Sequence, residues 1–115
     1  MPNIEILKLH DNYIATLDDW VFTRLSLLQE LDVSNNLVKY IPGSISSCRC
    51  LKAINLSKNH LVSVSRHVFQ LPKLSYLDVS SNHFTILPFE IVKAERLKMF
   101  TLDWFRYLNP PLEIT

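Results

Sequence analysis

Apolar residues recur along the chain at the same positions of a repeated unit. Within a unit, the first apolar residue is followed by others three, five and ten residues later. The units are 24 and then 23 residues long, and they begin at Ile4, Leu28, Leu51, Leu74 and Leu97. The alternation of the middle two apolar positions predicts a short strand, because successive side chains of a strand point to opposite faces. Such a unit cannot bury its apolar edge alone, so the pattern predicts stacked coils with one shared core.

An asparagine follows each of the first four predicted strands at the same distance, as Asn12, Asn36, Asn59 and Asn82. The sharp turn after a strand buries backbone groups that need hydrogen-bond partners. An asparagine amide carries two donor hydrogens and an acceptor oxygen, so one inward-turned side chain can bond the backbone of its own coil and of the next. We therefore interpret these asparagines as buried structural residues.

The combined pattern, L-x-x-L-x-L-x-x-N-x-L, resembles the leucine-rich repeat family over essentially the whole chain. The steps Ile41-Pro42 and Leu87-Pro88 are similar to those of the common class with 23-residue repeats. The resemblance implies an α/β leucine-rich repeat solenoid, a right-handed superhelix of about four and a half repeats. A parallel β-sheet would form its concave face, and short helical or irregular segments would form its convex face. Phe22 and Phe69 are expected to fill the interior under these segments.

Residues 1–115 are interpreted as a single repeat domain. Its last unit, residues 97–115, is either a degenerate repeat or a cap, since Phe105 replaces the asparagine and Pro110-Pro111 stops regular structure. No cap precedes Ile4, so the open side of the first coil should be apolar and could drive self-association. This asymmetry fits a free-standing domain and a fragment of a longer protein equally well.

Charge and cysteine usage narrow the function classes. The 12 basic and 11 acidic residues nearly balance, so no global field attracts nucleic acid or an anionic membrane. With Gly43 as the only glycine, Gly-rich phosphate loops are excluded. No apolar stretch is long enough to insert into a membrane, and the first ten residues do not resemble a secretory signal. Cys48 and Cys50 are too close for an easy disulfide, which favours a reducing, cytoplasmic location, with Cys48 as a core thiol.

The residues between the inward leucines would face outward on the concave side, where repeat proteins bind partners. These residues have a small acidic excess, which favours a protein partner that presents basic residues. The predicted contact residues are Tyr13, Glu30, Asp32, Asn55, Tyr76, Asp78, His83 and Trp104. Two alternatives stay open: the aspartates could simply keep the sheet soluble, and Trp104 could fill the cap.

Neither catalysis nor a bound cofactor is expected from the pattern. His60 and His83 occupy equivalent positions one coil apart, but two imidazoles are half of a zinc site and no third ligand is evident. Their pairing would instead make the surface sensitive to pH. An open sheet offers no water-excluding cleft or oxyanion donors, so we do not expect an enzyme. Asn55-Leu56-Ser57 matches the glycosylation sequon, and we interpret the match as accidental.

The sequence therefore predicts an intracellular scaffold for protein–protein interaction, of the kind used in signalling, that binds its partner through the concave sheet. The alternative is a targeting or regulatory repeat segment of a larger multidomain enzyme, receptor or pathogen effector. Nucleic-acid binding is not expected, because the predicted face lacks the clustered Lys and Arg that phosphate contacts require.

Overall fold

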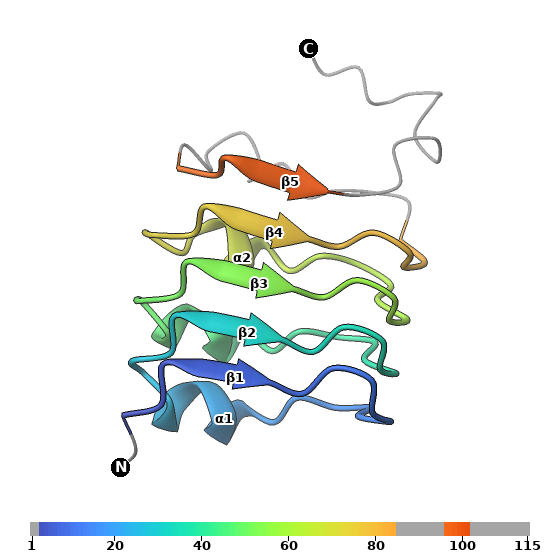
Figure 1. Cartoon of the computed structure of the whole chain (residues 1–115), viewed down its shortest axis with the longest axis horizontal. Helices are drawn as coiled ribbons and strands as arrows, with labels where there is room; N and C mark the ends of the chain where they lie inside the picture. The colour runs from blue at the N-terminus through green and yellow to red at the C-terminus, as the bar shows by residue number, and fades with distance from the viewer. Residues whose placement is uncertain (1–2, 85–95, 102–115) are drawn as a thin grey trace.

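Five short parallel strands form one sheet in the order of the chain (Figure 1). The computed structural model describes residues 3–84 and 96–101. The strands are β1 (Ile6–Lys8), β2 (Glu30–Asp32), β3 (Ala53–Asn55), β4 (Tyr76–Asp78) and β5 (Met99–Thr101). Each strand pairs only with the strands of the coils before and after it, as a solenoid requires. The predicted leucine-rich repeat solenoid is therefore confirmed.

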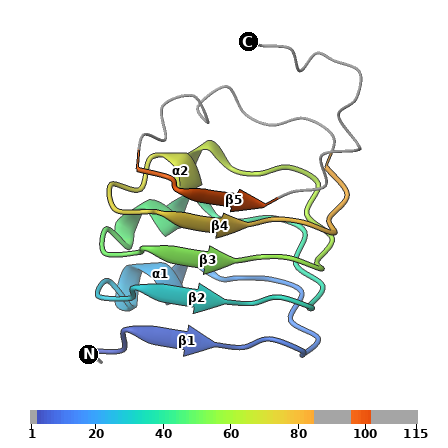
Figure 2. The ribbon, with the colours of Figure 1, turned by 45° about the horizontal axis from the view of Figure 1, so that its top comes forward.

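Short helices lie on the side of the coils opposite the sheet (Figure 2). They are α1 (Asp19–Arg24), the 3₁₀ helix η1 (Gly43–Ser47) and α2 (Arg66–Phe69). The last of these begins where the Ser65 hydroxyl accepts a hydrogen bond from the His67 amide, 3.2 Å away. The short helical segments expected on this side are confirmed. None of the described helices has the length and apolar character needed to cross a membrane.

The core is a column of side chains that passes through every coil. Leu31, Ile54 and Leu77 are in register in adjoining strands, and each is at most 2% exposed. Phe22 and Phe69 fill the interior beneath the helices, as the sequence predicted. Since each coil leaves one apolar side uncovered, stacking is what removes this surface from water.

Cys48 is the core thiol that the sequence predicted. It is fully buried, and its Sγ lies 3.3 Å from the carbonyl oxygen of Phe22 and 3.5 Å from that of Leu25. Burial, with a smaller contribution from Cys50, raises the pKa of this thiol from 9.0 to about 11. Both cysteines are free, and Cys50 is partly buried.

The buried asparagines tie neighbouring coils together. Asn59 is 3% exposed, and its Oδ1 accepts from the Val38 amide at 3.0 Å. Its Nδ2 donates to the carbonyl oxygens of Val33, Leu56 and Ser57. Asn36 and Asn82 make the equivalent bonds at their own places in the repeat.

The direction of these bonds corrects one expectation. Asn59 reaches the carbonyl of Val33 and the amide of Val38, which belong to the preceding coil, and not the backbone of the next coil. The reason is geometric: the side chain turns inward at the end of its own strand and faces the coil already beneath it. Consequently Asn12, in the first coil, is exposed and bonds only Leu9 and His10 of its own coil.

The residue before each of these asparagines adopts a left-handed backbone conformation. The φ angles are positive at Asp11 (61°), Asn35 (55°), Lys58 (57°) and Ser81 (56°). Only glycine, and to a lesser degree Asn and Asp, enters this region easily, and other L-residues pay about 1–2 kcal/mol. The turn geometry of the repeat therefore overrides local preference at Lys58 and Ser81.

The outer side of the first coil is apolar, as predicted. Leu7, Leu9, Ile14 and Leu17 are only partly buried there, and they border an open hollow of about 480 Å³. At the other end, the predicted cap beyond Thr101, including Trp104, Phe105 and Pro110-Pro111, lies outside the described residues, and so does the Leu87-Pro88 step.

Candidate protein-binding face

The outward residues of the five strands form two rows across the sheet, which we call the sheet face. The first row is Ile6, Glu30, Ala53, Tyr76 and Met99, and the second is Lys8, Asp32, Asn55, Asp78 and Thr101. Residues within a row are directly paired between neighbouring strands, which lie about 4.8 Å apart. The solenoid thus brings together side chains that are 23 or 24 residues apart in sequence.

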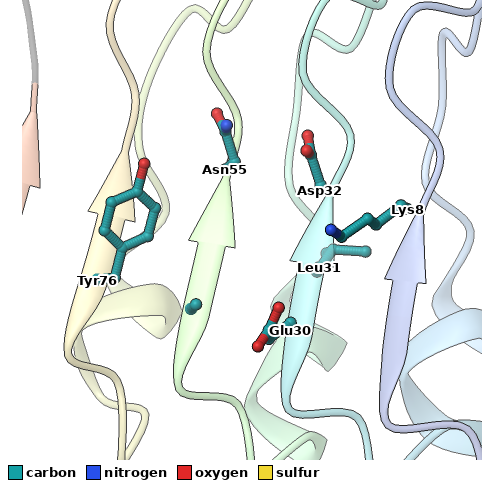
Figure 3. A pocket seen from close by; sticks show the side chains of 7 residues that line it. Lys8, Glu30, Leu31, Asp32, Asn55 and Tyr76 are labelled. Carbon is teal, nitrogen blue, oxygen red and sulfur yellow. The ribbon is translucent and has the colours of Figure 1, made fainter.

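Four of the predicted contact residues line one shallow hollow in this face (Figure 3). Its lining consists of Lys8, Glu30, Leu31, Asp32, Ala53, Asn55 and Tyr76. The volume is about 170 Å³. Pockets for small-molecule ligands are usually about 300–1,000 Å³. The hollow is therefore smaller than a typical pocket for a small molecule.

Part of the polar surface has a structural role. Asp32 Oδ1 accepts from the Ser34 amide at 3.0 Å and from the Ser34 hydroxyl at 2.7 Å. Asn55 and Asp78 hold the serine two residues further on with the same two distances. These bonds close the turn after each strand. One oxygen of each aspartate therefore has a structural role in a turn, while Asp32 Oδ2 lies 3.7 Å from His10 Nδ1.

The pKa of Tyr76 reflects its burial and the negative charges near the hollow. Burial, followed by the negative charges of Asp78 and Asp32, raises the pKa of its phenol above 10.0. The phenol therefore keeps its proton at neutral pH and can donate a hydrogen bond. Because Glu30 also lines the hollow, its centre favours a cationic side chain.

Tyr13, Asp78 and His83 are not among the residues that line the hollow. Tyr13 is 88% exposed in the loop after β1. His83 lies after β4, where its Nε2 is 3.0 Å from Nδ1 of His60 and the ring centroids are 5.0 Å apart. This confirms that the two rings approach within one strand spacing. Trp104 lies outside the described residues.

No group of three or more metal-ligating side chains occurs within residues 3–84 and 96–101. The histidine pair there is accordingly a two-nitrogen arrangement without a third protein ligand. The hydrogen bond between the rings needs one protonated nitrogen and one bare nitrogen.

Sequence reasoning left Lys8 out of the contact set, although it lines the hollow. Figure 3 shows its side chain extending from β1 towards β2. Its place in the repeat could have identified it, because Lys8 is equivalent to Asp32 and pairs with it between β1 and β2. Its ammonium lowers the net negative charge of the hollow.

A family profile described as "Leucine rich repeat" matches residues 2–61 and 49–104. The chain belongs to the leucine-rich repeat family. The fold is typically a non-enzymatic interaction module, and leucine-rich repeat domains generally mediate protein–protein interaction.

Several curated relatives contain this repeat within much longer chains. Mouse Toll-like receptor 9 is 39% identical over 85 residues, which cover 71% of this chain and 8% of the receptor. Mouse PH domain leucine-rich repeat-containing protein phosphatase 1 is 30% identical over 104 residues, 89% of this chain and 6% of the phosphatase. A probable serine/threonine-protein kinase of Dictyostelium discoideum, pats1, is 37% identical over 98 residues, which cover 79% of this chain and 3% of the kinase. The chain spans less than a tenth of the length of each of these three relatives.

Two solved structures have the same fold. A leucine-rich repeat protein of Leptospira interrogans aligns with a TM-score of 0.83 and 26% identity, covering 88% of this chain and 26% of that chain. The FLRT2 repeat domain, in an octameric complex with Latrophilin 3 and Unc5D, aligns with a TM-score of 0.60 and 24% identity, covering 87% and 39%. The second likeness concerns the fold alone.

Proposed function

We propose that this chain binds a protein partner through its sheet face, with the hollow around Glu30, Asp32 and Tyr76 receiving a basic side chain of the partner. The observation that carries the proposal is the convergence of these side chains from β2 and β4 in a hollow of side-chain size. General use of the family in protein–protein interaction supports it.

Arginine fits the hollow better than lysine. Its planar guanidinium can pair with the Glu30 carboxylate while stacking on the Tyr76 ring. Exposed ion pairs contribute about 0.2–1 kcal/mol each, so the ring contact is needed to make this site dominate binding.

The test is affinity capture with three immobilised forms of the chain. Glu30→Gln/Tyr76→Ala removes one carboxylate and one ring from the hollow without breaking the serine turns of Asp32 and Asp78. Asp18→Asn/Tyr40→Ala makes the matched changes at exposed residues away from the sheet. Proteins that bind the wild type and the control but not the sheet-face variant support the proposal. Identical captured sets refute it, provided that far-ultraviolet circular dichroism shows equal folding.

A defined probe complements the capture experiment. A fluorescein-labelled octa-arginine peptide, followed by fluorescence polarisation, should bind the sheet-face variant about threefold to tenfold more weakly than the wild type. The control should differ by less than about twofold. Equal weakening of both variants would assign the effect to net charge.

A second proposal concerns the longer proteins in which such repeats occur. Some relatives, such as the phosphatase and the kinase, are by name enzymes of which this repeat region is a small part. In that setting the chain would supply binding, and other segments would supply chemistry. Co-purification of phosphatase or kinase activity with the full reading frame, but not with residues 1–115, tests this division.

Self-association and a cytoplasmic location also stay as proposals. The open apolar hollow of the first coil supports the former, and the two free thiols support the latter. Concentration-dependent sedimentation of the wild type and of a Leu17→Glu variant tests self-association, and imaging of a fluorescent fusion tests location. A monomer at all concentrations would reject self-association. Secretion of the fusion would reject the cytoplasmic location.

A further inference from the structure

Four cationic side chains converge at the amino-terminal edge of β3, β4 and β5. Lys52, Lys73, Arg96 and Lys98, together with Ser75, line an open hollow of about 570 Å³. We call these four charges the basic rim. All four side chains are exposed, and none forms an ion pair with another described residue. The four charges are thus not neutralised by a carboxylate of the described residues.

The backbone holds the rim together. The amide of Ser75 donates to the carbonyl of Lys52 at 2.9 Å, and the amide of Lys98 donates to the carbonyl of Ser75 at 2.8 Å. These residues occupy the same place in successive coils, so they stack at the strand spacing of about 4.8 Å. Lys73 and Arg96 form a second pair of equivalent positions, two residues before Ser75 and Lys98 respectively.

The charge of this edge reverses along the solenoid. At the place equivalent to Lys52 and Lys98, the first two coils carry Glu5 and Gln29, and Glu30 follows Gln29 in the first row of the sheet face. The described residues 3–5 and 26–29, which lead into β1 and β2, include no Lys or Arg. The amides of Gln29 and Glu30 donate to the carbonyl of Glu5, so the acidic part and the basic part belong to one continuous ladder. A partner that lies along the edge meets negative charge at coils 1 and 2 and positive charge at coils 3 to 5.

The details of the rim argue against a compact phosphate site. Phosphate cradles present free backbone N–H groups. Here the amides of Ser75 and Tyr76 both donate to the Lys52 carbonyl, and those of Lys98 and Met99 both donate to the Ser75 carbonyl. The Ser75 hydroxyl also donates to Lys52. The rim thus offers flexible charges at several points, which suits an extended chain of anionic groups.

The surroundings favour a peptide over a nucleic acid. None of the described residues that line this hollow is aromatic, so they offer no ring on which a base could stack. Glu30, Asp32 and Asp78 on the adjacent sheet face would repel a phosphate backbone that extends beyond the rim. A peptide of mixed charge avoids this repulsion, because its acidic residues can be confined to one end.

We infer that the basic rim binds an acidic segment of the protein partner, and that the reversal of charge along the edge fixes the direction in which this segment lies. The inference rests on the proposed protein-binding function. Carboxylates two residues apart in an extended peptide are about 6.6–6.8 Å apart, so a short run of Asp or Glu can contact cations of adjacent coils. The acidic end lies over coils 3 to 5, and any basic end lies over coils 1 and 2.

Fluorescence polarisation with a labelled octa-glutamate peptide tests the rim. Lys73→Gln/Arg96→Gln should weaken binding about threefold to tenfold. Lys39→Gln/Arg66→Gln removes the same two charge types from exposed positions elsewhere and should change binding by less than about twofold. Wild-type binding should also weaken as NaCl rises from about 0.05 to about 0.3 M, because the Debye length shortens. Circular dichroism of both variants checks that they are folded.

Three outcomes would overturn the inference: no salt-sensitive binding of octa-glutamate, equal weakening by the two variants, or tighter binding of an octathymidylate than of the peptide. The last result would assign the rim to nucleic acid. Octa-arginine binding to Glu30→Gln/Tyr76→Ala tests the sheet face separately. The two proposals can therefore fail independently.

Discussion

Replacing Asn59 by alanine tests the structural role of the asparagines most directly. In the wild type the Val38 amide, which is fully buried, donates only to Asn59 Oδ1 among the described residues. The substitution leaves this N–H without a partner, at a cost of about 1–3 kcal/mol. The loss is smaller on the carbonyl side, where each oxygen that Asn59 bonds retains another donor.

The retained donors set the rest of the magnitude. Val33 still accepts from Asn36, Leu56 from Asn82, and Ser57 from the Asn35 amide. Losing the second bond to these carbonyls adds about 0.5–1.5 kcal/mol in total. We expect Asn59→Ala to lower the free energy of unfolding by about 1.5–4.5 kcal/mol, a large part of the 5–15 kcal/mol typical of a domain.

Asn12→Ala is the matched control. Asn12 is exposed and bonds only carbonyls of its own coil, and Leu9 keeps the bond from Asn36. Its replacement should lower the free energy of unfolding by less than about 1 kcal/mol.

Urea unfolding followed by circular dichroism measures both variants, and hydrogen exchange by NMR follows the Val38 amide. Losses within about 0.5 kcal/mol of each other, or a Val38 amide that stays protected in Asn59→Ala, would refute the reasoning.

Three further predictions concern the turns, the core and the buried thiol. Lys58→Asn should raise the free energy of unfolding by up to about 1 kcal/mol, because Asn adopts the left-handed φ of 57° more easily than Lys does. Urea unfolding measures this change, and a lower midpoint would contradict the prediction. Ile54→Ala should lower the free energy of unfolding by about 2–5 kcal/mol, because Ile54 is fully buried. Ile6 is 55% exposed, so Ile6→Ala should lower it by less than about 1 kcal/mol. Similar losses in urea unfolding would contradict the stacked core. The native Cys48 thiol keeps a proton that the unfolded chain releases above pH 9.0, so stability should fall as pH rises towards about 11. Urea unfolding of Cys48→Val should show a smaller fall, and equal slopes would contradict the linkage.

The histidine pair shows how far a period can predict contacts. His60 and His83 occupy the same place in successive coils, so the repeat alone predicted that their rings meet, and they do. The same reasoning placed Leu31, Ile54 and Leu77 in one column. It failed for the direction of the Asn59 bonds, because the period makes the coil above and the coil below equivalent.

The sequence by itself determined the coil, its inward residues and the rows in which outward residues stack, because the inward apolar positions of the repeat are buried only when neighbouring coils stack in register. The tertiary structure decided which residues of different rows meet. Lys73 and Lys98 have different places in their repeats, yet they line one hollow, since the turn that carries the chain into each strand brings the two rows together. Such contacts depend on the path of the backbone between coils and on the reach of long side chains. The repeat pattern of the sequence predicts neither of these.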